Sequence, residues 1–260
     1  MKITALVENT TQKDFPVEHG LSLFIETDWH RILFDTGQST LFAENAKRMG
    51  IDLSTVDLCV LSHGHYDHGG GLKEFTLLND KAPIYMNRNA FGFYYHGEEK
   101  YIGLNRDWID DEEFRKRVVY TDRNVVIDEQ LSILGPKSQK AYEMGSAGLC
   151  FREDGCFFPE DFRHEHYLMI SENGKRILIS GCSHQGIINI MDWFRPDVLV
   201  GGFHFMKQEL NERLAGYGRE LDGFDCTYYT CHCTGVEQYR FLTKYMSKVH
   251  YLSEGDTVII

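Results

Sequence analysis

The stretch of sequence that decides the fold is residues 58–71, Leu-Cys-Val-Leu-Ser-His-Gly-His-Tyr-Asp-His-Gly-Gly-Gly. Its first four residues are apolar, which is typical of a buried strand, and its last three are glycines, which are typical of a loop. Where a buried strand ends, the side chains that follow are released from the core, so several of them can turn toward one point. The segment therefore predicts a ligand-bearing loop at the end of a strand.

Four side chains in this loop have the chemistry of metal ligands: His63, His65, Asp67 and His68. His63 and His65 are two positions apart, on the same side of an extended chain, whereas Asp67 and His68 follow the bend and can address a second point. Imidazole and carboxylate suit zinc, iron or manganese, and two such ions roughly 3.5–4 Å apart can hold a bridging hydroxide. We therefore expect a site for two divalent metal ions, zinc first, with iron or manganese as alternatives. Surface histidines in a flexible loop are the other interpretation, but they would not explain this density of ligands directly after a core strand.

The rest of the chain alternates between strand and helix patterns. We expect strands at 1–7, 21–25, 31–34, 57–62, 167–170, 176–179, 197–200 and 226–229, and helices at 39–50, 186–190, near 207–215 and at 236–248. Strands that open each half, followed by strand and helix units, predict two mixed sheets packed between outer helices. The expected fold class is α/β, a four-layer αβ/βα sandwich, formed as a single domain over residues 1–260.

Residues 88–118 differ from this pattern because aromatic side chains crowd together there without a clear period. Such an insertion could cover a pocket. It could equally be a peripheral subdomain with its own small core, or an oligomer contact.

Composition narrows the classes of partner. The formal net charge of −12 would repel a nucleic-acid backbone, and no apolar run approaches the roughly 18 residues needed to cross a membrane. The odd set of seven cysteines, most of them in apolar runs, favours reduced thiols. We expect a cytoplasmic protein with a small-molecule substrate and with neither nucleic acid nor membrane as partner, and a homo-oligomer stays open as an alternative to a monomer.

The histidine and aspartate pattern resembles the signature of the metallo-β-lactamase superfamily, and Ile32-Leu-Phe-Asp-Thr-Gly37 resembles its upstream Asp-x-Gly element. Within the superfamily, one branch is similar at five segments and is named for a dihydropterin/ribofuranosyl-aminobenzene-phosphate synthase of methanopterin biosynthesis. The segments are Glu18-His-Gly-Leu-Ser22, Phe34-Asp-Thr-Gly-Gln-Ser39, Gly181-Cys-Ser-His-Gln-Gly186, Gly201-Gly-Phe-His204 and His232-Cys-Thr-Gly235. Most members of that branch carry its name by similarity, so the resemblance indicates a subfamily more than a reaction.

The resemblance implies roles for residues far from the histidine loop. Asp35 matches a carboxylate that steadies the metal-binding loop without touching metal, and His232 matches the last metal ligand. His164 stands where a third histidine is expected, and Cys182 where an aspartate usually bridges the metals, which is a departure from the family pattern. His184 could replace either of them, and we order the three candidates as His184, Cys182, His164.

Two more histidines are candidates for contact with a substrate. His204 follows an apolar strand, and its imidazole could protonate a leaving group or hold an oxyanion. His19, before the strand at 21–25, is a candidate for the substrate rim.

These residues favour a metal-dependent hydrolase that uses a metal-bound hydroxide on an ester, phosphoester or amide-like bond, with Asp67 orienting the hydroxide. The branch name suggests a different class, a transferase that condenses a dihydropterin. An iron redox protein and a metal-binding sensor without turnover are further alternatives on the same fold.

Overall fold

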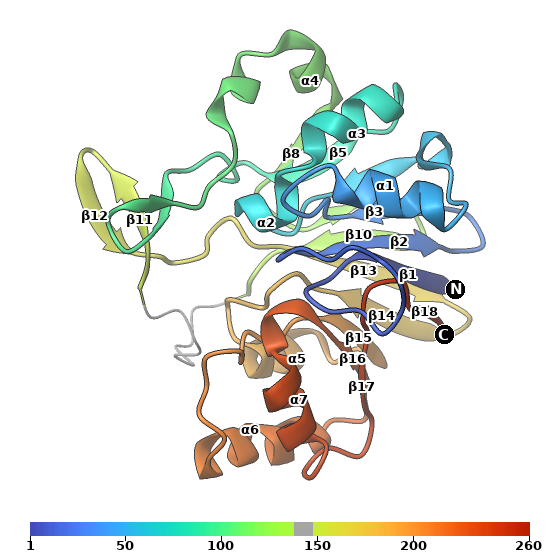
Figure 1. Ribbon diagram of the computed structural model, residues 1–260, viewed down its shortest axis with the longest axis vertical. Coiled ribbons are helices and arrows are strands. Elements are labelled where there is room, and N and C mark those ends of the chain that lie inside the picture. Colours follow the sequence, from blue (N-terminus) through green and yellow to red (C-terminus); the bar gives the residue numbers. More distant parts are fainter. Residues whose placement is uncertain (138–147) are drawn as a thin grey trace. The chain divides into compact units, whose positions relative to one another are not determined.

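The computed structural model describes residues 1–137 and 148–260 (Figure 1). They form two compact units, each with its own sheet and core. Unit 1 consists of Met1–Asp122, Gly148–His164 and Ser253–Ile260, and unit 2 consists of the described residues 123–137 and Glu165–Leu252. The single domain over 1–260 stays a prediction.

Unit 1 is built on a mixed seven-stranded sheet with the order β18-β1-β2-β3-β4-β5-β8. Its strands are β1 (Lys2–Val7), β2 (Ser22–Glu26), β3 (Arg31–Phe34), β4 (Leu58–Val60), β5 (Ile84–Asn87), β8 (Val118–Thr121) and β18 (Thr257–Ile259). The pairs from β18 to β3 are antiparallel, and those from β3 to β8 are parallel. The predicted first strand, hairpin and strand before the histidines are confirmed. Because β4 pairs with β3 and β5, the histidine loop leaves the sheet at an interior strand.

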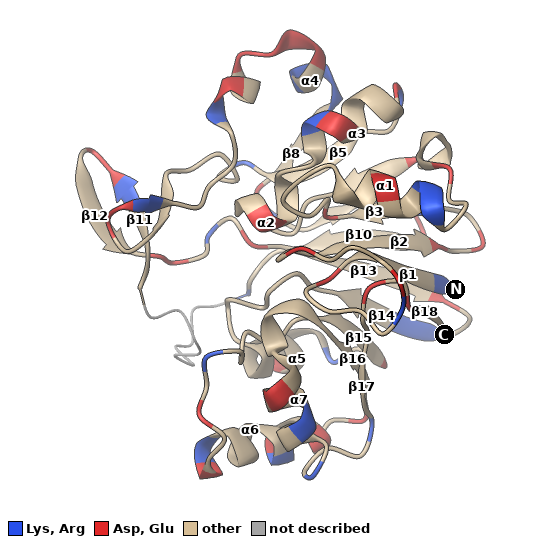
Figure 2. Cartoon of the chain, viewed as in Figure 1, with Lys and Arg blue, Asp and Glu red and all other residues tan. Residues whose placement is uncertain are grey.

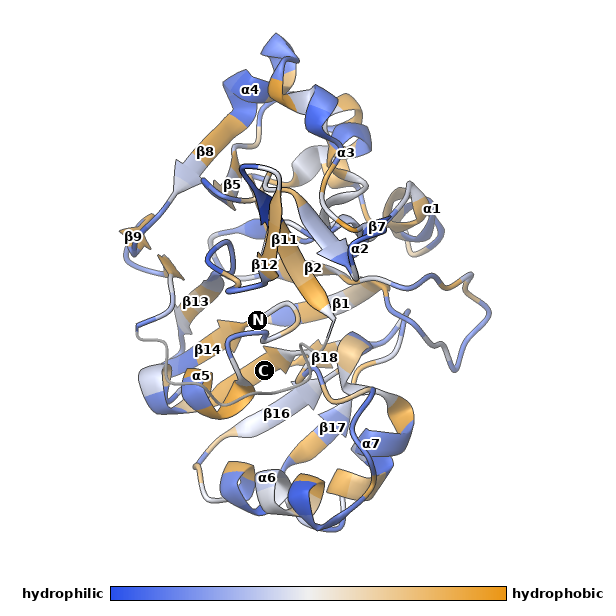
Figure 3. Cartoon of the chain, turned by 90° about the vertical axis from the view of Figure 1, so that its left-hand side faces the viewer, coloured by the Kyte–Doolittle hydropathy of each residue, from blue (hydrophilic) through white to orange (hydrophobic). Residues whose placement is uncertain are grey.

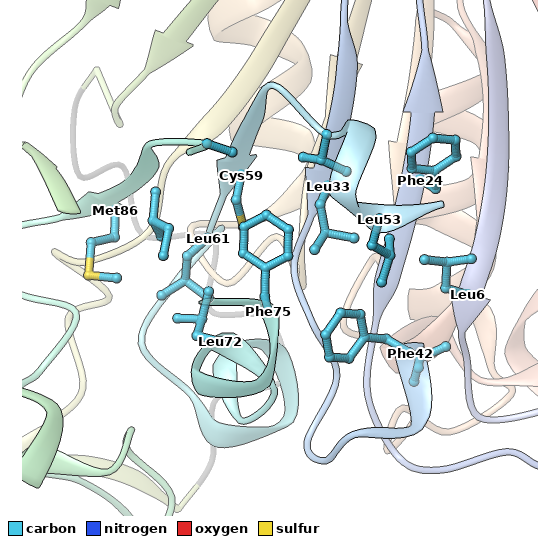
Figure 4. Close-up of a cluster of buried hydrophobic side chains, with 14 of the residues drawn as sticks. Leu6, Phe24, Leu33, Phe42, Leu53, Cys59, Leu61, Leu72, Phe75 and Met86 are labelled. Carbon is cyan, nitrogen blue, oxygen red and sulfur yellow. The ribbon is translucent and has the colours of Figure 1, made fainter. Parts of the chain in front are cut away.

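Four helices and two 3₁₀ turns accompany this sheet: α1 (Leu41–Arg48), α2 (Tyr66–Gly69), α3 (Leu72–Leu78), α4 (Glu112–Arg117), η1 (Leu53–Thr55) and η2 (Arg106–Ile109). Phe42 of α1 and Phe75 of α3 are fully buried in one cluster with Leu6 and Leu33 of the strands (Figure 4). Each such side chain contributes roughly 1.5–3 kcal/mol through burial. This packing holds α1 and α3 on one face of the sheet, and α2 carries part of the histidine loop.

The aromatic segment forms part of a second, smaller sheet in unit 1, with the order β12-β11-β6-β7. Its strands are β6 (Tyr94–His96), β7 (Lys100–Tyr101), β11 (Leu149–Glu153) and β12 (Cys156–Pro159). The sequence did not predict the β11–β12 hairpin, which completes this sheet. Phe91 and Phe114 are buried in the same cluster as Phe42 and Phe75, so part of the aromatic segment belongs to the main core of unit 1.

Unit 2 is built on another mixed seven-stranded sheet, with the order β17-β16-β15-β14-β13-β10-β9. Its strands are β9 (Val125–Val126), β10 (Leu131–Leu134), β13 (Tyr167–Glu172), β14 (Lys175–Ile179), β15 (Val198–Gly201), β16 (Thr227–Thr230) and β17 (Val249–Tyr251). Strands β14 to β17 are parallel, and β9, β10 and β13 join antiparallel. Strand β15 is apolar and buried along its whole length, as expected of a strand paired on both sides, whereas β14 begins with two exposed cationic residues and is apolar only in its second part (Figure 3).

The helices of unit 2 are α5 (Ile187–Phe194), α6 (Glu212–Asp222) and α7 (Val236–Leu242), and η3 (His232–Thr234) is a 3₁₀ turn. The helix predicted near 207–215 lies later in the chain, as α6. The reason is a cap: the Asn211 side chain accepts hydrogen bonds from the backbone N–H groups of Arg213 and Leu214, which fixes the start of α6. The predicted extent of α7 to Lys248 was also wrong. After Leu242 the chain forms tight turns, in one of which the Tyr245 N–H donates to the Leu242 carbonyl oxygen at 2.8 Å.

The predicted α/β fold with two mixed sheets is therefore confirmed. Among residues 1–137 and 148–260, the structure contains no helix with the length and apolar character required to cross a membrane.

Candidate functional site

The histidine loop of unit 1 brings its imidazoles together at the end of β4. The ring centroid of His63 lies 4.6 Å from that of His65 and 4.1 Å from that of His68, and all three rings are buried. Gly64 lets the chain pass close to a neighbouring loop, since a Cβ there would lie 2.0 Å from the carbonyl oxygen of Ala90. This close approach requires glycine between the two histidines.

A fully buried carboxylate, Asp35, fixes one side of this cluster. Its Oδ1 accepts a hydrogen bond from the Ser62 N–H at 2.7 Å, and its Oδ2 lies 2.7 Å from both Ser62 Oγ and His68 Nδ1. Ser62 Oγ lies 2.9 Å from His63 Nδ1 in turn. Burial raises the pKa of Asp35, and His68 and Ser62 oppose that rise. An ionised Asp35 accepts protons from Ser62 and His68, which leaves His63 Nδ1 to donate to Ser62.

A second buried carboxylate, Glu160, fixes the other side. Its Oε1 lies 3.0 Å from His65 Nε2 and 2.6 Å from His164 Nε2. Burial disfavours ionisation of Glu160, but the charges and hydrogen bonds of His65 and His164 outweigh it and hold its pKa at about 2. Glu160 therefore accepts the Nε2 protons of both imidazoles.

The structure places His164 among these groups with a protein partner at each ring nitrogen. Its Nδ1 accepts a hydrogen bond from the Gly64 N–H at 2.7 Å, its Nε2 faces Glu160, and its ring stacks on Tyr94 at 4.0 Å. Burial lowers the pKa of His164, which favours the neutral imidazole. His65, Glu160 and His164 have ligand atoms within 4.8 Å of one another. A metal on His164 would have to replace one of its present hydrogen bonds, and its assignment as a ligand stays a prediction.

Asp67 and His19 lie at the more open side of the loop. Asp67 Oδ2 is 3.3 Å from His19 Nε2 and 3.9 Å from His68 Nε2. The hydrogen bond to Asp67 raises the pKa of His19, whose side chain is half exposed. His19, the predicted residue of the substrate rim, therefore contacts the predicted ligand Asp67.

The atoms left facing inward fit a metal ion. His63 Nε2 and His65 Nδ1 lie 3.1 Å apart. With the proton positions that Asp35 and Glu160 impose, both atoms present lone pairs. Two imidazole nitrogens at 2.0–2.1 Å from a tetrahedral zinc ion would be roughly 3.3 Å apart. The donor set and its spacing in unit 1 are therefore suited to a divalent cation.

Three loops of unit 2 carry the other predicted site residues, Cys182, His184, His204 and His232. Two hydrogen bonds join these loops: the Gly202 N–H donates to the Gly181 carbonyl oxygen at 2.8 Å, and the Phe203 N–H donates to the side-chain Oγ1 of Thr234 at 2.8 Å.

Within these loops the rings of His184 and His204 lie 4.3 Å apart, while Cys182 and His232 are buried. Unit 2 thus gathers its own group of candidate ligands.

The backbone conformation is unusual at these loops. Ser183, His204 and His232 have φ values of 59°, 56° and 47°. Residues other than glycine seldom adopt such left-handed values, which cost of order 1–3 kcal/mol each where they are strained. The carboxylate of Glu165 supports the first loop by accepting hydrogen bonds from the N–H groups of His184 at 2.8 Å and Gln185 at 2.9 Å.

Sequence reasoning missed two of these carboxylates, Glu160 and Glu165. Both lie in the polar run 160–166, next to the predicted ligand His164. The signal that could have found Glu160 is its position four residues before that histidine. Glu165 gave no comparable signal, because it accepts hydrogen bonds from the Tyr167 hydroxyl and from backbone N–H groups of a distant loop, and neither kind of partner forms a recognisable pattern.

The predicted ligands thus divide between the units: His63, His65, Asp67, His68 and His164 belong to unit 1, and Cys182, His184 and His232 to unit 2. That they bind shared metal ions stays a prediction.

Comparison with known proteins gives similar sequences over almost the whole chain. An uncharacterized protein of Methanocaldococcus jannaschii is 32% identical over 256 residues, covering 93% of each chain. The 7,8-dihydropterin-6-methyl-4-(beta-D-ribofuranosyl)-aminobenzene-5'-phosphate synthase of the same organism is 27% identical over 288 residues, covering 99% of this chain and 96% of the relative.

A solved structure has the same fold over the full length. It is described as a metal-dependent hydrolase of the beta-lactamase superfamily, is 27% identical, and aligns with a TM-score of 0.84 over 100% of this chain and 99% of the other. The family model of the metallo-beta-lactamase superfamily matches residues 16–216. With these similarities and the histidine loop at the end of β4, the chain belongs to the metallo-beta-lactamase superfamily.

Proposed function

We propose that the protein is a metal-dependent hydrolase with a two-metal site, zinc being the first candidate, that cleaves an ester, phosphoester or amide-like bond of a small molecule. The observation that carries the proposal is the distance of 3.1 Å between His63 Nε2 and His65 Nδ1 in a buried cluster of imidazoles, where the proton positions inferred above leave a lone pair on each atom. Without a cation or a proton between them, two such lone pairs repel each other. The buried carboxylates that fix their tautomers are typical of the groups that orient metal-ligating histidines.

In the proposed ligand set, His63, His65, Asp67 and His68 come from unit 1, with His164 as its last candidate. His184, His232 and Cys182 are proposed from the sequence of unit 2. Bound divalent ions would polarise the scissile bond and make a water nucleophile available at neutral pH. Asp35 and Glu160 keep the imidazole protons away from the ligating atoms. Asp67 would orient the attacking water, and His204 would protonate the leaving group.

The test is removal and return of metal. Purified protein is assayed on 4-nitrophenyl acetate and bis-4-nitrophenyl phosphate before and after dialysis against a chelator, and its metal content is measured by elemental analysis. We expect about two equivalents of metal per chain and a loss of at least roughly 1,000-fold in rate on chelation, restored by metal. Hydrolysis that is unchanged after the metal has gone would reject the proposal, and elemental analysis separates zinc from iron and manganese.

A second candidate is a transferase that acts on a dihydropterin, which the 27% identity to the aminobenzene-phosphate synthase favours. Condensation of a reduced pterin with an aminobenzene riboside phosphate, followed by chromatography, tests it directly. Metal-loaded protein that forms the condensed product and hydrolyses neither nitrophenyl ester would favour this candidate over the hydrolase.

We further propose a cytoplasmic location, because the thiols suit a reducing compartment. Cys59 and Cys226 are buried, and burial raises the pKa of Cys226 to about 12. Thiol titration of metal-free protein in denaturant is expected to detect all seven cysteines. A lower count that rises on reduction would reveal disulfides and contradict this location.

A further inference from the structure

Unit 1 contains a cavity of about 840 Å³ beside the histidine loop. Five aromatic side chains take part in its wall: Tyr66, Phe93, Tyr95, Tyr101 and Trp108. A volume of this size is typical of sites that hold small molecules. Tyr66 stands between His65 and Asp67 in the sequence, so the cavity adjoins the proposed ligands.

Backbone contacts fix the cavity wall to the histidine loop. The N–H of Tyr66 donates to the carbonyl oxygen of Ile102 at 2.8 Å, and His65 forms an isolated antiparallel bridge with Gly103. Figure 3 shows β7, which carries Tyr101, close to α2, which carries Tyr66. A molecule in the cavity would therefore contact Tyr66, in the segment that also carries His65 and Asp67.

Two of the five aromatic side chains of the cavity are exposed and accessible to a ligand. Phe93 is 44% exposed and Tyr101 is 37% exposed, in contrast to the buried Phe91. The ring of Tyr95 meets that of Tyr101 edge to face at 5.4 Å, and the Tyr101 hydroxyl donates to the carbonyl oxygen of Leu104 at 2.7 Å. Burial raises the pKa of Tyr101 to about 12, so this donor keeps its proton. Flat rings held in this way can pack against another planar ring.

The charges of the cavity differ from those of the chain as a whole. Lys100 and Arg106 line it, with the Lys100 ammonium 5.8 Å from the ring centroid of Tyr66 and the Arg106 guanidinium 3.9 Å from that of Phe93. Asp107 is its acidic lining residue. The chain has a net charge of −12, and Figure 2 shows acidic and basic residues side by side around α4 in the same unit. Two cations on an aromatic wall are suited to an anionic ring compound.

We propose that this cavity binds a planar aromatic ring that carries a phosphate or carboxylate group, the ring lying between Tyr101 and Phe93 and the anion near Lys100. As a statement about the substrate, this rests on the proposed function, because it names the class of molecule that the proposed hydrolase would act on. As a statement about binding, it can be tested without metal.

The experiment uses the full chain freed of metal and isothermal titration calorimetry with three probes. 4-Nitrophenyl phosphate carries both ring and charge, inorganic phosphate carries the charge, and 4-nitroanisole carries the ring. We expect 4-nitrophenyl phosphate to bind at least roughly tenfold more tightly than either of the others, which corresponds to about 1.4 kcal/mol.

Two variants locate the binding. Lys100→Met is expected to weaken 4-nitrophenyl phosphate binding roughly tenfold and to leave 4-nitroanisole unchanged, because it removes the cation and keeps an apolar stem. Lys81→Met is the matched control, since Lys81 is exposed and does not line the cavity. Tyr101→Leu should weaken both ring-bearing probes, and thermal melting shows that each variant folds.

The proposal is overturned if 4-nitrophenyl phosphate binds no more tightly than inorganic phosphate, or if Lys100→Met and Lys81→Met have the same effect. Its failure is distinguishable from that of the proposed function. Binding to the cavity without any metal-dependent hydrolysis would support this inference and reject the hydrolase. Metal-dependent hydrolysis without tighter binding of the ring-bearing anion would support the hydrolase and reject this inference.

Discussion

The two units present their candidate ligands by different means, side-chain hydrogen bonds in unit 1 and backbone turns in unit 2. In unit 1 the carboxylates of Asp35 and Glu160 determine which nitrogen of each imidazole in the 63–68 loop carries the proton. Asp35 itself has a left-handed φ of 57°, but the direction of the imidazoles is set by its carboxylate.

In unit 2 the left-handed residues Ser183, His204 and His232 stand at or next to the candidate ligands, so the turn of the chain itself aims the side chain. This difference predicts which substitutions each unit should tolerate. Metal binding by unit 1 should weaken when a carboxylate loses its charge, even though the backbone keeps its conformation. Unit 2 should instead be destabilised by substitutions that restrict the backbone.

The largest expected effect is on unit 2, from Gly201→Ala. Gly201 has φ +147°, and a Cβ there would lie 2.1 Å from the backbone carbonyl oxygen of Ser180. Neither strand can yield without breaking the β14–β15 pairing, so we expect a loss of roughly 3 kcal/mol in the free energy of unfolding. Urea titration followed by circular dichroism measures it.

The matched control is Gly216→Ala, in the interior of α6, where nothing lies within 4 Å of the added Cβ. It should leave stability unchanged or raise it by about 0.5–1 kcal/mol. If Gly201→Ala is tolerated as well as Gly216→Ala, the backbone of unit 2 does not set the ligand geometry in the way described.

The next effect is on unit 1, from Asp35→Asn. Asparagine accepts left-handed φ values, so the backbone can stay as it is. Its Oδ1 can still accept from the Ser62 N–H, but its NH₂ would then face Ser62 Oγ and His68 Nδ1, where donors now point. Ser62 Oγ and His68 Nδ1 would both have to become acceptors. Ser62 would then donate to His63 Nδ1, so the imidazole protons would move to the ligating nitrogens of His63 and His68.

We expect Asp35→Asn to weaken metal binding by roughly 10–100-fold, measured by competition with a chromophoric chelator. Asp52→Asn is the control, a carboxylate in the same unit that accepts from the N–H of Ser54 at an exposed turn. Equal metal affinity of the two variants would contradict the proton assignment for Asp35.

The same contrast explains how much the sequence could predict. The ligand loop at 63–68 and the strand before it were predictable because the signal is local: apolar residues, then histidines at fixed spacing, then glycines. The two mixed sheets followed from strand and helix patterns of the same local kind.

Other features could not be predicted because they depend on partners far away in the chain. Glu160 acts on His65 from 95 positions away, and the start of α6 depends on a cap at Asn211 that a periodic pattern does not contain. The β11–β12 hairpin completes a sheet with β6 and β7, and nothing in residues 149–159 alone indicates that partner.

The smallest expected effect is that of Glu160→Gln, which tests whether the second carboxylate of unit 1 acts as the first does. Glutamine offers one carbonyl oxygen and one NH₂ group where two imidazole N–H donors converge, from His65 and His164. A carbonyl oxygen in the place of Oε1 can accept from both imidazoles, but the NH₂ group in the place of Oε2 would lie 3.2 Å from the His65 Nε2–H, donor against donor, which disfavours the present tautomer of His65. Because His164 Nδ1 already accepts from the Gly64 N–H, the change falls on His65, whose Nδ1 then gains a proton where a metal would bind.

We expect metal affinity to fall roughly tenfold, less than for Asp35→Asn, since one ligand is affected in place of two. Glu153→Gln, on the exposed β11–β12 hairpin, is the matched control and should bind metal as the parent protein does. Nitrogen NMR of the histidine rings in metal-free protein adds a readout that a general loss of packing would not give, because the Nδ1 and Nε2 signals of His65 should exchange their protonation pattern. If His65 keeps its tautomer while metal affinity falls, Glu160 acts through packing. Asp35 would then be the carboxylate of unit 1 that still supports the contrast with unit 2.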